Sequence, residues 1–528
     1  MAQELKSVSV GAPGFFGLNL QNNGIALDPS WASTATNCVI SKDGGMESRK
    51  GWLPVNSPKI SAGPPVEQIF EYIKGDGTTE IHSCAGVKIW KGTLTLTEIT
   101  PTIPPSNNNW KAQNFNNNIY YFQDGEHPLE YNGSGLLTRI SAGAGFLDSS
   151  DAVIATLKPN ECLSAFGRLW VADTATNKMK IWWSDALLAR QWTGGSSGSL
   201  DLRSVLTKGM DTIIGLRAWN GNLIIFLTNN ILIYSGAGVP SSMVLVENIV
   251  GIGCIARDSI QEIGTDIIFL SKNGVVSLGR SIQEKSLPMT DFSKNIRDKL
   301  NTYLNVMDAS KVRSVYSEPN AFYLLTISNT NRTISSTFCF DLRRPLDDDS
   351  YRVTVWDNIT PKSMLNTKNN KLYLGQGGYI GEYTGYFDNT STYRMAYYTT
   401  WLDFSRTVQE FNNRFPNYGV FIKMPKKLVM TITANIATTL TFKWLFDFSQ
   451  NTSSAQIQTM ANVTLYEFNM PVSEYNIAEY NSGGSTTAVQ IPLSGTGKVM
   501  KYGMECDVNG SKISILRIDI TAKLGRIS

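Results

Sequence analysis

Hydrophobic positions in the middle of this chain recur in short pairs of runs. Each pair has a turn residue, a few apolar or aromatic residues, a Gly- or Asn-type break and a second short run that ends near an aromatic residue. About seven copies follow one another at intervals of about 40 to 55 residues, which is typical of a four-stranded propeller blade. The copies occupy residues 81–92, 117–133, 167–185, 221–236, 265–279, 320–342 and 370–385.

Several of these runs are apolar at consecutive positions, as in Leu223–Phe226 and Leu372–Leu374. Strands of this kind are buried on both faces. A small sheet with two apolar faces must pack between two neighbours, and radial stacking of blades achieves this. A pair of ordinary β-sandwiches with similar hairpins is the alternative. The repeated hairpin type favours an all-β chain with a β-propeller of about six to seven blades.

The two ends of the chain depart from the repeat. We expect an N-terminal α+β segment at 1–60, a propeller-like domain at 61–403 and a C-terminal antiparallel β-sandwich-like domain at 404–528. In the N-terminal segment, Asp28-Pro29 is a helix-start signal and predicts a short helix over 29–36. The KDGG run at 42–45 then predicts a hairpin turn between two strands.

The C-terminal domain contains clean alternation in residues 418–447 and again in 512–527. In the last run the isoleucines stand at odd positions up to Ile515, and the next two, beginning with Ile518, stand at even positions. This switch predicts one extra residue, a β-bulge, near Leu516-Arg517. The polar stretch at about 450–490 is expected to form a long exposed excursion.

One amphipathic helix is expected at 291–304, where Phe292, Ile296, Leu300, Tyr303 and Leu304 share a face. It interrupts the blade series, so we expect it on the outside or rim of the propeller. Covering a sheet edge and binding a partner are both open roles for it.

The composition of the chain argues against several classes of function. Charged residues are 17% of the chain and the net charge is +3, so the chain lacks an overall polyanion-binding signature. The short basic run Lys423, Lys426 and Lys427 is typical of a solvated turn. Six scattered cysteines predict neither a disulfide framework nor a zinc site. Neither a signal peptide nor a transmembrane helix is recognisable, so membrane insertion is not expected.

Catalytic signatures are weak. The chain has two histidines, His82 and His127, which we expect in a strand and a loop. Neither accompanies a nucleophile motif, and no nucleotide-binding loop is present. The run Asp347–Asp349 is expected in a solvated loop rather than in a calcium site. We therefore expect no enzyme activity, cofactor or metal. The alternative is a propeller-type glycan-binding protein or glycoside hydrolase, because paired carboxylates remain possible and SKDGG (41–45) begins like an Asp-box.

The N-terminal run from Gly24 to Trp52 resembles the start of tail nozzle proteins of short-tailed bacteriophages, also called tail tubular protein B, tail hub or stabilisation proteins. Their pattern is an Asn, two strands around a Gly turn and Arg-x-Gly. The matching positions are Asn37, Gly44-Gly45, Arg49 and Gly51. The resemblance continues through the propeller-like repeats to the ending ITAKLGRI at 520–527.

The resemblance implies a structural tail protein of the virion, assembled in the bacterial host cytoplasm. About six copies would form a homohexameric ring below the tail adaptor proteins, continue the DNA-ejection channel, and carry fibres or spikes and a needle or plug. Double-stranded DNA would pass without specific binding. Trp31, Arg49 and Trp52 are the predicted ring or adaptor contacts, because Trp and Arg are frequent interface anchors. Packing of both tryptophans in a local core is an equally open alternative.

Overall fold

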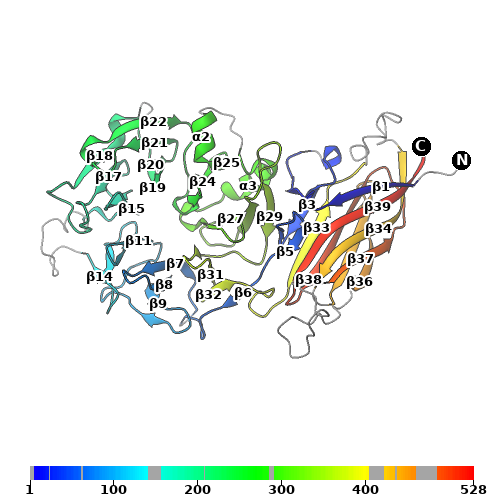
Figure 1. Cartoon of the computed structure of the whole chain (residues 1–528), viewed down its shortest axis with the longest axis horizontal. Helices are drawn as coiled ribbons and strands as arrows, with labels where there is room; N and C mark the ends of the chain where they lie inside the picture. The colour runs from blue at the N-terminus through cyan, green and yellow to red at the C-terminus, as the bar shows by residue number, and fades with distance from the viewer. Residues whose placement is uncertain are drawn as a thin grey trace, which may run out of the picture.

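The structure is a computed structural model that describes residues 5–22, 24–60, 63–140, 156–206, 209–284, 291–403, 421–434, 437–458 and 485–527. Two β-rich parts lie side by side (Figure 1): a ring of small sheets, and a sandwich of longer strands that contains β1 and β39. None of the helices in these ranges is long and apolar enough to cross a membrane.

The ring is a propeller of seven blades in the described part of the chain. Blades 1 to 4 are four-stranded antiparallel sheets in chain order. Their strands are β7 (Val66–Ile73), β8 (Thr79–Ala85), β9 (Lys88–Lys91), β10 (Thr97–Glu98); β11 (Lys111–Phe115), β12 (Asn118–Phe122), β13 (Leu129–Tyr131), β14 (Thr138–Arg139); β15 (Glu161–Ala165), β16 (Arg168–Ala172), β17 (Lys180–Trp183), β18 (Gly198–Asp201); and β19 (Ile213–Trp219), β20 (Asn222–Leu227), β21 (Asn230–Ser235), β22 (Val244–Val250).

The remaining blades differ at their outer edges. Blade 5 has three strands, and helix α2 (Leu278–Glu284) follows them. The outer strand of blade 7 is β6 (Trp52–Pro54), which the N-terminal part of the chain supplies and which closes the ring. Their strands are β23 (Gln261–Ile263), β24 (Asp266–Ser271), β25 (Gly274–Ser277); β26 (Arg313–Ser317), β27 (Phe322–Ser328), β28 (Ser335–Asp341), β29 (Arg352–Trp356); and β30 (Met364–Asn366), β31 (Leu372–Gln376), β32 (Tyr379–Tyr383).

Burial between neighbouring blades holds the ring together. Apolar residues on one face of blade 4, such as Leu223 and Ile225, pack toward blade 3, whereas Ile224 and Phe226 pack toward blade 5. These central strands are buried on both faces, as their uninterrupted apolar runs predict. Each of the seven repeats seen in the sequence coincides with the second and third strands of one blade. The predicted propeller is confirmed, and the alternative of two similar sandwiches is excluded.

The second part is a β-sandwich with two sheets that enclose one apolar core. One sheet has the order β37-β34-β39-β5-β4, and β1 pairs with β39. The other contains β36, β35, β38, β33, β3 and β2. The bounds are β1 (Leu5–Gly11), β2 (Gly17–Leu18), β3 (Trp31–Thr36), β4 (Cys38–Ile40), β5 (Met46–Ser48), β33 (Tyr393–Thr399), β34 (Phe421–Ala434), β35 (Thr439–Phe446), β36 (Ser453–Gln458), β37 (Ser485–Pro492), β38 (Met500–Val508) and β39 (Ile513–Ile527).

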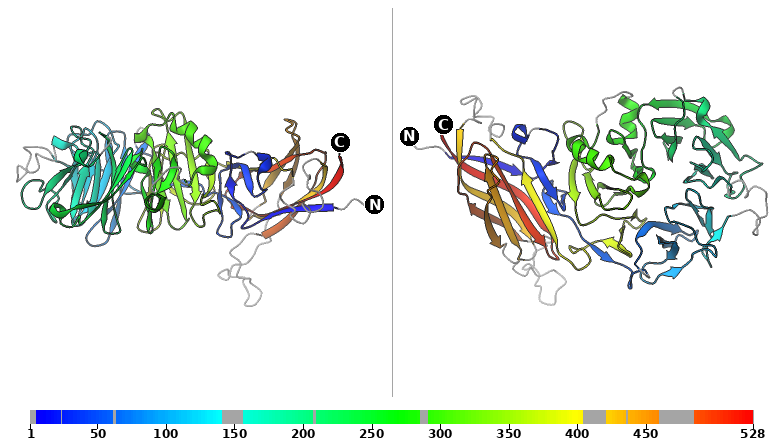
Figure 2. Two further views of the ribbon diagram at one scale, coloured as in Figure 1. Left: turned by 90° about the horizontal axis from the view of Figure 1, so that it is seen from above. Right: turned by 180° about the vertical axis from the view of Figure 1, so that it is seen from behind.

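The propeller and the sandwich share one sheet. Strand β29, the outer strand of blade 6, pairs in parallel with β2 and β3, so a ten-stranded sheet runs from blade 6 into the sandwich. Figure 2 shows the two parts following each other along the longest axis of the molecule. One buried core extends from blades 5 and 6 into the sandwich. We infer that the two parts move as one unit.

The N-terminal expectation requires correction. Residues 29–36 do not form a helix, because Trp31–Thr36 is strand β3. Asp28 and Pro29 instead form a turn, in which the Ser30 N–H donates to Asp28 Oδ1 and the Trp31 N–H donates to the Asp28 carbonyl. Pairing with β33 then holds the following residues as a strand. The separate segment drawn at 1–60 also differs from the structure, since β1 to β5 belong to the sandwich and β6 to the propeller.

Other local expectations are confirmed. The KDGG turn joins the β4–β5 hairpin. Strand β39 skips Leu516 in its pairing with β34, where Ile432 faces Ile515 and Thr431 faces Arg517, so the bulge lies where the parity switch predicts it. The expected helix at 291–304 consists of a 3-10 turn, Lys294–Ile296, and helix α3 (Arg297–Leu304), which packs on blades 5 and 6.

The expected excursion at 450–490 begins and ends in strands, β36 and β37. Its centre, 459–484, lies outside the described residues, as do 404–420 at the expected domain boundary.

Candidate functional site at the propeller axis

Six charged side chains meet where the inner strands of the blades converge, and we call them the axial cluster. Blades 2 to 6 each contribute at least one of them, from the innermost strand or from the turn just before it. The members are Lys111, Glu161, Arg217, Arg257, Asp258 and Arg313.

Asp258 is the centre of this cluster. Its carboxylate accepts two hydrogen bonds from Arg257, from Nε and Nη2, both at 3.0 Å. Arg313 Nη1 donates to Oδ2 at 3.2 Å, and Gln68 Nε2 donates to the same oxygen at 3.3 Å. Lys111 Nζ lies 4.0 Å from Oδ1. One carboxylate therefore binds side chains of four different blades.

The other members extend the network to the remaining blades. Arg217 Nη1 donates to Glu161 Oε1 at 3.1 Å, and Arg217 Nη2 donates to the carbonyl of Ile260. Arg313 Nε donates to the carbonyl of Lys362, which precedes blade 7. Arg257 and Arg313 also donate to Asn109, which precedes blade 2. Hence the cluster joins all seven blades at the axis.

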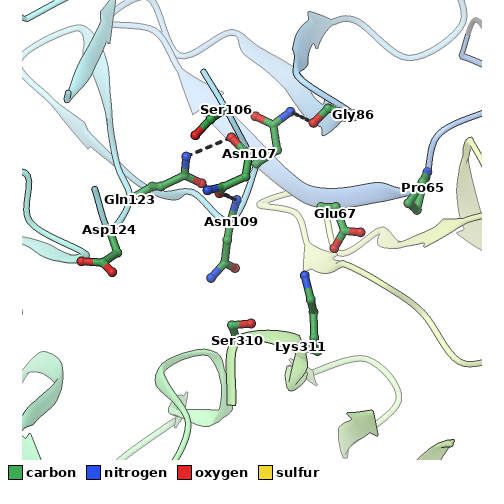
Figure 3. Close-up of a pocket in the computed structure, with 11 residues that line it drawn as sticks. Pro65, Glu67, Gly86, Ser106, Asn107, Asn109, Gln123, Asp124, Ser310 and Lys311 are labelled. Atoms are coloured by element: carbon green, nitrogen blue, oxygen red, sulfur yellow. Dashed lines mark hydrogen bonds between the residues drawn. The ribbon is translucent and has the colours of Figure 1, made fainter. Parts of the chain in front are cut away.

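Two cavities adjoin the cluster. The first, of about 560 Å³, lies beside the chain entering the inner strands and is lined by polar side chains including Asn107, Asn109, Gln123 and Asp124. Figure 3 shows the Asn109 amide extending into it, with Lys311 on the wall from blade 6. The second, of about 390 Å³, follows the inner strands themselves and is lined by Lys111, Asp258 and Arg313.

Electrostatics decide what this site can do chemically. Burial alone would raise the pKa of Asp258, but the positive charges of Arg257, Arg313 and Lys111 outweigh it and hold the pKa below its ordinary value. Burial lowers the pKa of Arg313 to about 10. Asp258 therefore stays ionised and Arg313 stays charged at neutral pH. A general acid needs a carboxyl group whose pKa is raised, which is the opposite of what Asp258 has.

The residues on which the family resemblance rests lie elsewhere, at the junction of propeller and sandwich. The Arg49 side chain is fully buried and binds Asp388 through two hydrogen bonds of 2.9 and 2.7 Å. Its Nε donates to Asn37 Oδ1 at 3.0 Å, and its guanidinium lies 4.0 Å from the centre of the Tyr393 ring. Asn37 in turn donates from Nδ2 to the carbonyl of Arg394 on β33.

The glycines of the same pattern are required by close packing. A Cβ on Gly51 would lie 1.8 Å from the carbonyl oxygen of Phe387, and one on Gly44 would lie 2.5 Å from Pro13. Gly44 also has a positive φ of 78°. We call Asn37, Gly44, Gly45, Arg49 and Gly51 the junction motif.

The three residues predicted as interface anchors are not brought together as one surface. Arg49 and Trp52 are buried, and Trp52 packs in the core between blades 6 and 7. That is the local-core alternative. Trp31 is partly exposed and packs edge-on against Phe16, with ring centres 5.4 Å apart. A contact with another chain thus stays a prediction with Trp31 as its most accessible member.

Other residues noted in the sequence have structural surroundings. His82 lies on β8, as predicted, where its Nδ1 is hydrogen-bonded to Tyr121 and its Nε2 to Glu80. His127 lies in a loop, as predicted. In the run Asp347–Asp349, Asp348 binds Lys294 and Asp349 binds Arg280. Among the described residues, no group of His, Cys, Asp and Glu side chains could hold a metal ion. All six cysteines are buried and unpaired.

Sequence reasoning missed the axial cluster. A signal was present, because most members stand at the same place in successive repeats, in or just before the first strand of a blade. Aligning the repeats on their hairpins would have placed Lys111, Glu161 and Arg313 in a common column, with Arg217 two residues further along its strand. Which of these charges pair with each other depends on the ring, and the repeats alone do not show it.

Comparisons with known proteins find distant likenesses among solved structures. No family model and no curated protein matches the chain. Among solved structures, the WD40 domain of Neurospora crassa Pan2 is similar at 10% identity and a TM-score of 0.36, over 64% of this chain and 96% of that one. The exo-beta-1,3-galactanase of Phanerochaete chrysosporium is similar at 8% identity and a TM-score of 0.26, over 90% of this chain and 100% of that one.

A third similar structure is the extracellular domain of a hybrid two component system of B. thetaiotaomicron, at 11% identity and a TM-score of 0.38. The match covers 64% of this chain but only 40% of that one, so this chain spans less than half of the length of that protein. Such distant likenesses concern the fold alone, and no activity or partner follows from them.

Proposed function

We propose that the chain is a structural component of the tail of a short-tailed bacteriophage, a nozzle or hub subunit. About six copies would form a ring by heterologous contacts, in which one face of a subunit meets a different face of the next. The ring would continue the DNA-ejection channel below the adaptor proteins and carry fibres or spikes. The subunit would be assembled in the bacterial cytoplasm and reside in the virion.

The junction motif is the observation that carries this proposal. Two residues on which the resemblance to nozzle proteins rests make contacts where the propeller meets the sandwich: Arg49 through its buried ion pair, and Gly51 through a contact that leaves no room for a Cβ. Gly44 makes a similarly close contact within the sandwich. The resemblance therefore concerns residues that determine an architecture. A rigid two-part subunit suits a ring that transmits the force of attachment.

The axis of the propeller supports a structural role further. Its carboxylates are neutralised by arginines, and Asp258 lacks the raised pKa of a catalytic acid. Because the axial cluster occupies this position, DNA would pass through the centre of the subunit ring and not through a propeller. A balanced net charge of +3 also suits transit, since each neutralised phosphate adds affinity that would retain the DNA.

The second candidate is a glycan-binding propeller or glycoside hydrolase of a tail. The polar cavity of about 560 Å³ favours it, because clustered amides such as Asn107, Asn109 and Gln123 suit hydroxyl groups. This candidate predicts sugar binding or turnover by the isolated chain. The structural proposal requires neither.

Location and copy number in the virion test the proposal. Gold-labelled antibodies against the chain should mark the tail of purified particles in electron micrographs. Quantitative mass spectrometry should give about six copies per particle. Purified chain should also bind the adaptor complex, and Lys42→Met, an exposed change near the junction motif, should leave that binding intact. Absence of the chain from purified virions would defeat the proposal, as would sugar cleavage by a stable monomer.

A further inference from the structure

The axial cluster carries an excess of positive charge. Among the residues that the structure describes, Lys111, Arg217, Arg257 and Arg313 form ion pairs with two carboxylates, those of Glu161 and Asp258. The neighbouring pair of Arg332 and Glu67 is neutral and does not change this balance. Buried charges without a counterion are costly, so a cluster of this kind favours the entry of an anion.

Lys111 is the least satisfied of the four cations. The three arginines each donate hydrogen bonds to carboxylates or carbonyls within the cluster. Lys111 Nζ forms no hydrogen bond with the residues that the structure describes, and its nearest carboxylate oxygen is 4.0 Å away. The Lys111 side chain is 18% exposed, and it lines the adjoining cavity. Burial, and then the charge of Arg217, lower its pKa, as expected for a cation with few compensating contacts.

The cavity next to Lys111 has room and further polar groups. Its volume of about 390 Å³ exceeds the space that a lone small anion needs and lies in the range of small-molecule sites. Asn366 lines it, and the side-chain oxygen Oδ1 of Asn366 is buried without a hydrogen-bond partner. Phe70 and Tyr316 add apolar ring surface, and Gln113 adds an amide. The carboxylate of Glu262, which also lines the cavity, is exposed to water.

We propose that this cavity binds a small polyhydroxylated ligand with one anionic group, the chemistry of a sugar acid or a sugar phosphate. The anionic group lies against the ammonium of Lys111. A hydroxyl group donates to Asn366, and the aromatic side chains contact the ring of the ligand. The site belongs to the isolated chain and does not depend on the proposed place in a phage tail, so either proposal can fail without the other.

Isothermal titration calorimetry at constant ionic strength tests the site with D-glucuronate, glucose 6-phosphate, inorganic phosphate and D-glucose. Saturable binding is expected for one or both of the sugar anions, and which one binds identifies the anionic group. We expect D-glucose and inorganic phosphate to bind at least about tenfold more weakly, since each lacks one half of the recognised chemistry.

Variants assign the binding to this cavity. Lys111→Gln should weaken binding by about tenfold or more, because a charge-assisted contact is lost. Asn366→Ala should weaken it without altering the axial cluster. Lys311→Gln is the matched control, since Lys311 lines the other cavity and should leave affinity unchanged. Circular dichroism checks that each variant is folded. If Lys111→Gln does not fold, Asn366→Ala still tests whether the ligand binds in this cavity.

Three results would overturn the proposal. The first is no saturable binding of either sugar anion up to about 10 mM. At that ligand concentration, a site with a Kd below about 10 mM would be mostly occupied. The second is binding that Lys111→Gln and Asn366→Ala leave unchanged. The third is equal binding of inorganic phosphate, which would mean an adventitious ion only.

Discussion

Replacement of Arg49 by methionine should destabilise the protein more than any surface substitution near it. The change keeps a long apolar side chain but removes the guanidinium that binds Asp388 at 2.9 and 2.7 Å and Asn37 at 3.0 Å. Asp388 would remain as a mostly buried carboxylate without its partner, since only 11% of its side chain is exposed.

The magnitude follows from the type of contact. Removing one partner of a buried ion pair costs about 3–5 kcal/mol, because the other charge is left uncompensated. The two hydrogen bonds to the carboxylate, at about 1.5–3 kcal/mol each, give a loss of the same size. The double variant Arg49→Met, Asp388→Asn should recover part of this loss, and the coupling between the two sites should be about 2 kcal/mol or more.

Urea unfolding followed by tryptophan fluorescence and far-UV circular dichroism measures these differences. Lys42→Met is the control, since Lys42 is an exposed lysine of the same hairpin and should change the free energy of unfolding by less than about 0.5 kcal/mol. The reasoning is refuted if Arg49→Met costs less than about 1 kcal/mol, or if the double variant is no more stable than the two single losses combined predict.

Three further predictions follow from local geometry. Burial lowers the pKa of His82 below 6.5, so the unfolded chain binds a proton more readily than the folded chain. The contribution of His82 to stability should be full above pH 6.5 and fall as the pH drops below it. His82→Gln should flatten this pH dependence of the free energy of unfolding in urea titrations. Gly51→Ala should prevent soluble folding because its Cβ would lie 1.8 Å from a carbonyl oxygen, whereas Gly238→Ala, with open space around it, should fold normally; equal yields and melting temperatures would contradict this. Deletion of Leu516 should leave a cooperatively folding protein, because this bulge residue is unpaired with β34. Deletion of Asp519 should prevent cooperative folding, because it turns the buried Ile520 toward solvent. Comparable circular dichroism melts for both deletions would exclude this interpretation of the bulge.

Repeated local pattern explains why so much of the propeller could be predicted. Each hairpin carries its own signal: apolar runs such as Leu223–Phe226 require burial on both faces, and the turns between them are set by neighbouring residues. The bulge at Leu516 is equally local, because parity along one strand reports it. Such features depend on residues close in sequence.

Features that join distant residues could not be predicted in this way. Strand β3 pairs with β33, a strand more than three hundred residues away in the chain. The Asp28-Pro29 signal is local and carries no information about this pairing, so it predicted a helix where the strand lies. Strand β6 is the outer edge of blade 7 although it precedes blade 1 in the chain, so the N-terminal segment seemed separate.

The sequence by itself determined a propeller of about six to seven blades, the hairpin at the KDGG turn and the lack of an overall charge signature, because these follow from periodicity and composition. Only the tertiary structure decided that Arg49 is an internal ion-pair partner of Asp388 and that Lys111, Asp258 and Arg313 meet at one axis. The physical reason is that charge pairing and desolvation depend on distances between side chains, and these distances are fixed only when the ring closes.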